Sequence, residues 1–242
     1  MRRNHIVTAI LATLLMGILQ AQAAEPDAKE LGREVARGDL AQASIVCDHL
    51  IAQYEKLMAT DAKGDSWKTL HSMEVGYYLA AKAQIFALKG DHQEAAQQLN
   101  TAEQYGTTHP EITGFLSGWE GVLEDTRAFL LEKKGATDAA ATAYEHSDSE
   151  HAHARLALLA LRSGDNAEAR RWASKEPENP TALLVIGRVD EKGTTHADGK
   201  AAYDKAWQIL QDSLVLGKNN EFLPIYFCEG TAITAAWHQP AK

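Results

Sequence analysis

A short phrase recurs four times in the 242-residue sequence and predicts how its helices are joined. In each copy a glycine is followed five residues later by an alanine: Gly38 and Ala43, Gly90 and Ala95, Gly135 and Ala140, and Gly164 and Ala169. Glycine ends a helix cheaply because it tolerates the left-handed backbone, and a small polar residue behind it caps the next helix. The alanine then lies one turn into that second helix, where its methyl group lets two helices approach closely.

The phrases resemble the turns of the tetratricopeptide repeat (TPR) family. In the best copy, residues 79–110, small and large apolar residues occupy the expected positions around the turn: Ala83, Phe86, Ala95, Leu99 and Ala102, with Pro110 shortly beyond. The first copy departs from the family, because Glu34 stands where a large apolar residue is expected. The glycines are also spaced unevenly against a family period of about 34 residues. The longer gaps predict lengthened first helices over 66–89 and 111–134.

The sequence predicts an all-α protein, a right-handed α-solenoid of about five helix hairpins. Aromatic residues make up only 7% of the chain and alanine is abundant, a composition that favours helix over sheet. We expect TPR-like repeats over 24–178 and a C-terminal hairpin with a capping tail over 179–242, in which Asn179 and Pro180 start a helix. Five apolar residues of the tail are expected to be buried over the end of the stack: Phe222, Leu223, Ile225, Tyr226 and Phe227.

The first 23 residues have the order of a secretory signal peptide. Arg2 and Arg3 precede an uncharged apolar run over 6–19, and the small residues Ala21 and Ala23 supply a cleavage site. An uncleaved membrane anchor is the alternative, but the run is short against the roughly 20 residues that a spanning helix needs. We therefore expect cleavage after Ala23 and a periplasmic or secreted protein without stable membrane insertion.

Charge and motifs exclude several classes of function. The formal net charge is −9, which argues against a nucleic-acid partner because that binding neutralises phosphates. The acidic surplus is expected to form a solvated surface and, secondarily, to favour basic partners. The sequence contains no phosphate-binding loop, dinucleotide fingerprint, nucleophile elbow or zinc-protease helix. No cofactor and no catalytic residue are therefore predicted.

The densest cluster of potential metal ligands lies near residue 150. It comprises His146, Asp148, Glu150, His151 and His153, and imidazole and carboxylate are suitable donors for zinc or a similar ion. The spacing differs from that of a His-Glu-x-x-His helix, and His151 and His153 diverge if the segment is helical. The alternative is a solvated turn in which Asp148 or Ser149 caps the next helix.

The two cysteines, Cys47 and Cys228, are an even pair in an oxidising compartment, which favours a disulfide. Stacked helices oppose the bond, because neighbours lie about 8–10 Å apart and a disulfide needs Cα atoms within about 7 Å. The bond therefore requires that the solenoid curl or that its tail fold back, and the sequence leaves this open.

The resemblance to TPR proteins implies a binding or adaptor role, in which a peptide or protein surface lies in the concave groove and no reaction is catalysed. Tyr77, Tyr78 and Trp119 lie on predicted first helices, which line that groove in such repeats, so they are the expected groove residues. Packing between hairpins is the alternative for most of the aromatic residues. Two other functions stay open: a periplasmic hydrolase acting on cell-wall material through carboxylates that meet only in the folded chain, and a metal-binding protein using the histidine cluster.

Overall fold

The computed structural model describes residues 27–60, 64–115, 118–147, 149–193, 196–216 and 224–239. All regular secondary structure in these ranges is α-helical, so the all-α prediction is confirmed. The predicted signal peptide, residues 1–23, lies outside the described residues. The helices, in chain order, are α2 (Ala28–Arg37), α3 (Leu40–Thr60), α4 (Asp65–Leu88), α5 (His92–Thr108), α6 (Pro110–Phe115), α7 (Trp119–Lys133), α8 (Thr137–Ser147), α9 (Glu150–Ser163), α10 (Asn166–Ala173), α11 (Pro180–Gly193), α12 (His196–Leu216), α13 (Pro224–Phe227) and α14 (Gly230–His238).

All four predicted glycine turns are present. Their glycines take left-handed backbone angles: φ is 81° at Gly38, 79° at Gly90, 85° at Gly135 and 87° at Gly164. They join α2 to α3, α4 to α5, α7 to α8 and α9 to α10, and the helices of each pair pack on one another. The alanine of every phrase is completely buried, which confirms its role at the close approach of two helices: Ala43, Ala95, Ala140 and Ala169.

Capping side chains complete three of these turns. Asp39 accepts a hydrogen bond from the backbone N–H of Gln42 at 3.0 Å. In the same way, Asp91 accepts from the N–H of Glu94 and Asp165 from that of Glu168. Each aspartate satisfies a backbone donor that the start of a helix leaves without an intrahelical partner. The third copy has Ala136 in the place of the aspartate and forms the turn through its glycine.

The two predicted long first helices have different outcomes. The helix expected over 66–89 is confirmed as α4. The one expected over 111–134 is wrong, because α6 ends at Phe115 and α7 begins at Trp119. Gly114, Ser117 and Gly118 lie around the break, and glycine and serine are weak helix formers. The predicted helix start after Asn179 is confirmed, since Pro180 is the first residue of α11 and the Asn179 side chain accepts from the Thr181 N–H at 2.9 Å.

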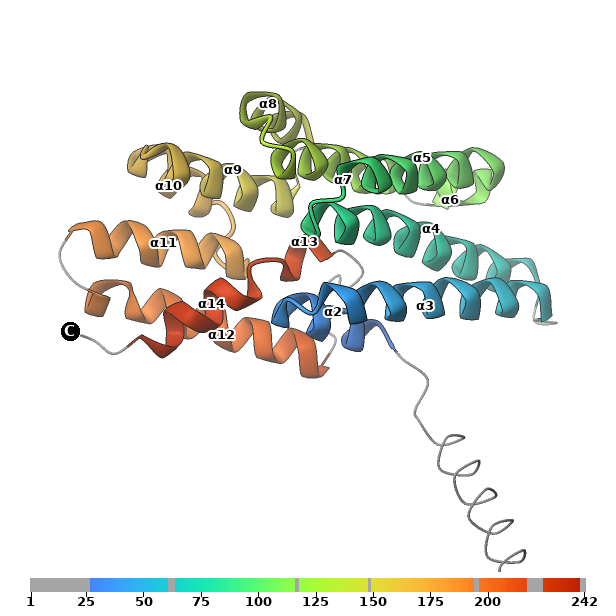
Figure 1. The fold of residues 1–242 in the computed structure, drawn as a ribbon, viewed down its shortest axis with the longest axis horizontal. Coiled ribbons are helices and arrows are strands. Elements are labelled where there is room, and N and C mark those ends of the chain that lie inside the picture. The colour runs from blue at the N-terminus through green and yellow to red at the C-terminus, as the bar shows by residue number, and fades with distance from the viewer. Residues whose placement is uncertain are drawn as a thin grey trace, which may run out of the picture.

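Successive helix pairs pack against their neighbours along the chain. Helix α3 contacts α4, α4 also contacts α7, α8 contacts α9, and α10 contacts α11. Figure 1 shows α3, α4, α5 and α7 on one side of the molecule and α9, α10, α11 and α12 on the other. A buried apolar cluster runs from α4 through α9, and a smaller one joins α9, α10 and α11.

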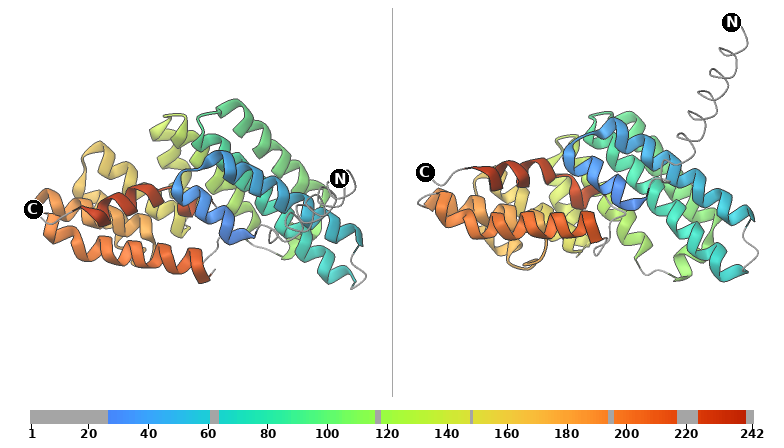
Figure 2. Two further views of the ribbon diagram at one scale, coloured as in Figure 1. Left: turned by 60° about the horizontal axis from the view of Figure 1, so that its bottom comes forward. Right: turned by 90° about the horizontal axis from the view of Figure 1, so that it is seen from below.

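The tail, which we define as α13 and α14, returns to the beginning of the chain. It contacts α2 and α4 as well as α11 and α12, so it joins the two ends instead of covering the last hairpin alone (Figures 1 and 2). Ile225, Tyr226 and Phe227 are buried as expected, whereas Phe222 and Leu223 lie outside the described residues. The contact is close: a Cβ atom added to Gly230 would lie 2.7 Å from the Cα atom of Ala36.

Candidate functional site

A pocket of about 300 Å³ opens between α5 and α7, two helices that lie side by side in Figure 1. Its volume is at the small end of the range for ligand pockets. Trp119, Leu123 and Gly106 are buried lining residues, and exposed residues of both helices complete the walls. The pocket therefore combines an apolar floor with a polar rim.

Two glycines make room for the indole ring of Trp119, which is 2% exposed. A Cβ atom added to Gly106 in α5 would lie 2.5 Å from the indole Nε1, and one added to Gly76 in α4 would lie 3.2 Å from Cη2. The indole ring of Trp119, which belongs to α7, thus lies between α4 and α5. The ring of Tyr77 packs against it in a T-shaped arrangement, with the two ring centroids 6.1 Å apart. The edge that carries Nε1 faces Gly106, and both residues line the pocket.

The rim of the pocket is mainly acidic. Glu103, Glu120 and Glu124 face the pocket together with one cation, Arg127. Arg127 bonds to Glu103, with Nε at 2.9 Å and Nη2 at 2.7 Å from Oε1. Because that cation is already paired, Glu120 and Glu124 leave the rim with an excess of negative charge.

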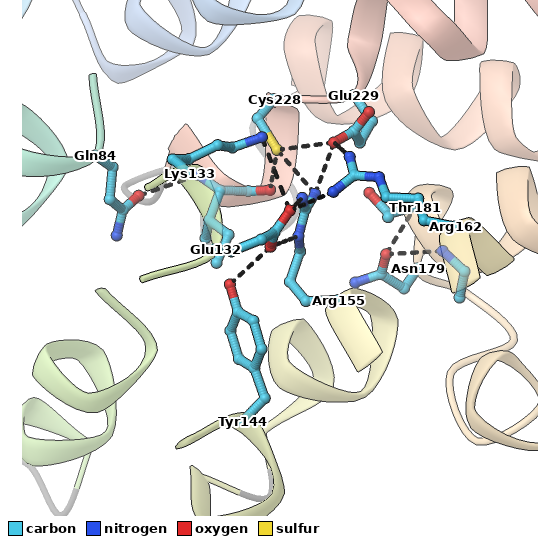
Figure 3. A network of polar contacts seen from close by, with 12 residues as sticks. Gln84, Glu132, Lys133, Tyr144, Arg155, Arg162, Asn179, Thr181, Cys228 and Glu229 are labelled. Atoms are coloured by element: carbon cyan, nitrogen blue, oxygen red, sulfur yellow. Dashed lines mark hydrogen bonds and ion pairs between the residues drawn. The ribbon is translucent and has the colours of Figure 1, made fainter. Parts of the chain in front are cut away.

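A second polar site is buried where the tail meets α7 and α9. We call it the clamp: Arg155 of α9, Glu132 of α7, and Cys228 and Glu229 at the start of the turn before α14 (Figure 3). The Arg155 side chain is 1% exposed and that of Glu132 is 2% exposed. The guanidinium donates from Nε to Glu132 Oε2 at 2.8 Å, from Nη2 to Glu132 Oε1, and from Nη1 to Glu229 Oε1 at 2.8 Å.

Ionisation in the clamp follows from this arrangement. Burial alone would raise the pKa of Glu132, but the charge and hydrogen bonds of Arg155 outweigh it and hold the pKa at about 2. The pKa of Glu229 is lowered by the same balance. Burial favours a neutral guanidinium, yet Cys228, Glu132 and Glu229 raise the pKa of Arg155 well above its usual value. The arginine and the two glutamates of the clamp are therefore charged and form an ion-pair network inside the protein.

Further bonds fix the clamp in place. Tyr144 donates to Glu132 Oε2 at 3.1 Å, and Arg162 donates to Glu132 Oε1 at 2.8 Å from the partly exposed side. Burial raises the pKa of the Cys228 thiol to about 12, so the thiol stays protonated and unreactive. With each charged group paired, the clamp can hold the tail on α7 and α9 but offers no group to a substrate.

The structure does not gather those predicted metal ligands that it describes around one point. Within the described ranges, no three histidine, cysteine, aspartate or glutamate side chains are grouped as a metal site. His146 is exposed and its Nδ1 lies 2.6 Å from the Thr142 carbonyl oxygen, whereas His151 is buried edge-on against Tyr226. These two side chains occupy different environments, so the cluster in sequence is not a cluster in space.

The remaining predicted ligands have other roles or are not described. His153 is half-buried, with Nδ1 2.6 Å from a Glu176 carboxylate oxygen and its ring stacked on Trp172. Glu150 is exposed in the first turn of α9, and Asp148 lies outside the described residues. Ser149 caps α9 by accepting from the Ala152 N–H at 3.0 Å, one of the two capping residues that the alternative interpretation named.

The two cysteines are free thiols in the structure. Cys47 is buried, and its Sγ donates to the Tyr78 carbonyl at 3.1 Å. Cys228 donates to the Ile225 carbonyl, also at 3.1 Å, and accepts from Arg155. The tail does fold back, the condition that the sequence set for a bond, but it brings Cys228 to the clamp and not to Cys47.

The three aromatic residues expected in a groove are separated. Tyr78 is 1% exposed and stacks on Tyr54, so it belongs to the core, whereas Tyr77 is half-buried beside Trp119. Among the three, only Trp119 lines the α5–α7 pocket. The packing alternative therefore describes Tyr78, and Trp119 combines packing with access to a pocket.

Sequence reasoning missed both the acidic rim and the clamp. A lone glycine inside a helix lowers its stability, so Gly106 within α5 was a sign that something approaches closely there. Arg155 stands among alanines and leucines on α9, whose other buried residues are apolar except for His151. An arginine in that position indicates a buried partner. Neither sign identifies which distant residue supplies the contact.

The comparisons with known proteins add no relative. No family model matches the chain, and neither the curated proteins nor the solved structures gave a match. In the part of the chain that the structure describes, no helix combines the length and apolar character needed to cross a membrane.

Proposed function

We propose that this chain is an exported, TPR-like α-solenoid that binds a peptide or protein partner and catalyses no reaction. The observation that carries the proposal is the recurrence of one turn geometry at four places, each joining two packed helices. Helices α11 and α12 also pack together, and in this proposal they are the fifth hairpin. Repeated hairpins that bury their apolar faces on one another form an extended surface, which in such proteins serves recognition.

The pocket between α5 and α7 gives such a scaffold a place to hold a partner's side chain. It lies between the second helix of one hairpin and the first helix of the next. A buried aromatic floor surrounded by a polar rim is the usual anatomy of a recognition site. The right-handed, TPR-like arrangement and the export of the chain through residues 1–23 are parts of this proposal.

The hydrolase alternative requires two nearby carboxylates in different protonation states. Glu132 and Glu229 are the buried carboxylates that share a partner, and Arg155 lowers the pKa of both. Neither holds a proton near neutral pH, so the pair does not supply a general acid. The clamp carboxylates therefore give the hydrolase alternative no support.

Photo-crosslinking in living cells tests the binding function. A photoreactive amino acid replaces Glu120 on the pocket rim, and a matched variant carries it at Glu145, an exposed residue of α8. We expect a discrete crosslinked protein from position 120 and none from position 145. Equal recovery from the two positions, or from neither, contradicts the proposal. The N-terminus of the exported protein, read by mass spectrometry, is expected to be Ala24.

A further inference from the structure

We infer that the α5–α7 pocket binds a basic segment of an extended peptide, holding a backbone carbonyl at Trp119 and a lysine or arginine side chain at Glu120 and Glu124. The inference rests on the proposed binding function and names the chemistry of the partner. Three features of the pocket carry it: an indole donor without an acceptor, an excess of carboxylates, and a small volume with an apolar floor.

The indole N–H of Trp119 supplies the first argument. The residue is 2% exposed, and within the described part of the chain its N–H donates to no acceptor, although its ring packs against Tyr77 and two glycines. Tryptophan N–H groups usually find a hydrogen-bond partner, and Nε1 of Trp119 is not among the described polar atoms that are both buried and unpaired, so its N–H is open to the pocket. Since Nε1 faces Gly106 at the pocket wall, an acceptor can come from a ligand in the pocket.

The rim charges restrict which acceptor can enter. A ligand carboxylate or phosphate would meet Glu120 and Glu124, whose charges repel it, while Arg127 is engaged by Glu103. An uncharged carbonyl oxygen avoids that repulsion and still accepts from the indole. The donor therefore selects an amide carbonyl rather than an anion.

The same rim selects a cation for the remainder of the ligand. Glu120 and Glu124 are both exposed and stand one turn apart on α7, where like charges destabilise the helix slightly. A lysine or arginine between them relieves this repulsion and gains charge-assisted hydrogen bonds. The negative net charge of the whole chain, −9, favours the approach of a basic partner over the same surface.

A peptide meets both requirements in one molecule, whereas a polyamine meets only one. A basic peptide carries a cationic side chain and a backbone carbonyl within the same few residues. A free polyamine carries cations but no carbonyl for Trp119. The volume of about 300 Å³ accommodates a short segment and not a folded partner.

Nuclear magnetic resonance of the indole N–H groups tests the inference directly. The protein is labelled with ¹⁵N at its five tryptophans, and the Trp119 signal is assigned by replacing the other four individually with phenylalanine. The probes are acetyl-Ala-Lys-Ala-Arg-Ala-amide, its counterpart with Glu and Asp in place of Lys and Arg, and spermidine. We expect the basic peptide to move the Trp119 signal downfield in a saturable way, and the other two probes to leave it in place.

Paired variants separate the rim from the overall charge. Glu120→Gln with Glu124→Gln is expected to weaken binding of the basic peptide about fivefold. Glu55→Gln with Glu145→Gln changes two exposed residues of α3 and α8, removes the same total charge and is expected to leave the affinity unchanged. Raising the salt concentration is expected to weaken binding of the wild-type protein.

The outcomes distinguish this inference from the function on which it rests. No shift with the basic peptide, an equal shift with the acidic peptide or spermidine, or equal losses in the two double variants overturns the inference. If the protein still captures a partner through position 120 while the basic peptide fails to bind, the binding function stands and only the ligand chemistry is wrong. If both experiments fail, the two proposals fall together.

Discussion

The glycine turns and the contacts of the tail hold helices together by different means. We call the tail contacts the joint: it comprises the clamp, the hydrogen bond from the Ile225 N–H to Gln84, and the packing of the tail on α2. Each turn is built from about six consecutive residues and occurs four times, so its structure depends on local sequence. The joint depends on residues that occur once and lie far apart: Arg155 and Glu229 are separated by 74 positions, and Gln84 and Ile225 by 141. A defect in one turn is therefore local, whereas a defect in the joint separates the two ends of the chain.

The largest effect is expected from Arg155→Met, which removes the centre of the joint. Glu132 and Glu229 would remain buried without their main partner, and breaking a buried ion pair in this way costs about 3–5 kcal/mol. Urea unfolding at pH 7 measures the change in the free energy of unfolding. The difference in the free energy of unfolding between the variant and the wild type is expected to shrink toward pH 4, because the unpaired carboxyl groups of Glu132 and Glu229 then take up protons.

The matched control is Arg162→Gln. Arg162 also bonds to Glu132, but its side chain is 47% exposed, so its loss is expected to cost less than about 1 kcal/mol. Equal effects from the two arginine variants would show that the buried pair does not hold the joint.

The next effect concerns the close approach of the tail to α2. Gly230→Ala places a methyl group 2.7 Å from the Ala36 backbone, which cannot move aside as a side chain tip can. Overpacking of this kind costs about 1–3 kcal/mol. Hydrogen exchange is expected to show faster exchange in α2 and α14 than in α7. Protection unchanged in α2 would contradict the contact between the two ends.

Acid should weaken the joint through His151, whose ring lies edge-on against Tyr226 of the tail. Burial lowers the pKa of His151 from 6.5 to about 4, so the folded protein binds fewer protons than the unfolded chain between these values. The stability contributed by the neutral ring is complete above pH 6.5 and is lost as the pH falls toward 4. We expect a loss of about 1–2 kcal/mol between pH 7 and pH 5.

Thermal unfolding across that range measures the effect. Glu150 lies 3.9 Å from the ring of His151 and reduces the loss to the extent that it is ionised. His151→Phe is expected to flatten the pH dependence, whereas the variant of the exposed residue His146→Gln should keep it. An unchanged slope in His151→Phe would assign the acid sensitivity to other groups.

The most local effect is expected at a single turn. Gly90→Ala forces a residue with a Cβ atom into a left-handed conformation, which costs about 1–2 kcal/mol. The control, Gly121→Ala, lies inside α7 with open space around the added methyl group and should stabilise the protein by about 0.5–1 kcal/mol. Differential scanning calorimetry compares the two variants. If both variants raised the unfolding temperature, or both lowered it, the role assigned to the turn would be contradicted.

The sequence predicts the local glycine turns well and the contacts between distant residues poorly. The turns at Gly38, Gly90, Gly135 and Gly164 were predictable because glycine, cap and small residue lie within one short segment. The break between α6 and α7 was not, since weak helix formers around Gly118 compete with a continuous apolar pattern. The contacts of Arg155 were beyond reach, because nothing along the chain specifies which distant carboxylates a buried arginine meets.

The candidate site was predictable only in part. Trp119 was expected in a groove and does line a pocket, but its burial depends on Gly76 and Gly106 in two other helices. Tyr78 was expected beside it and lies in the core, because adjacent residues of a helix point in different directions. The carboxylates at the rim come from α5 and α7 together, and only the fold shows that these helices are neighbours.

The return of the tail to α2 has a consequence for biosynthesis. Leu31 and Val35 of α2 share a buried cluster with Phe227 and Ile233 of the tail. The side of α2 that packs on α3 can be covered as soon as α3 has been made, whereas the side that contacts the tail stays uncovered until α13 and α14 have been made. Such distant pairing delays compaction. The contacts between the tail and α2 are therefore among the last that a growing chain can form, after the hairpins between them have been completed.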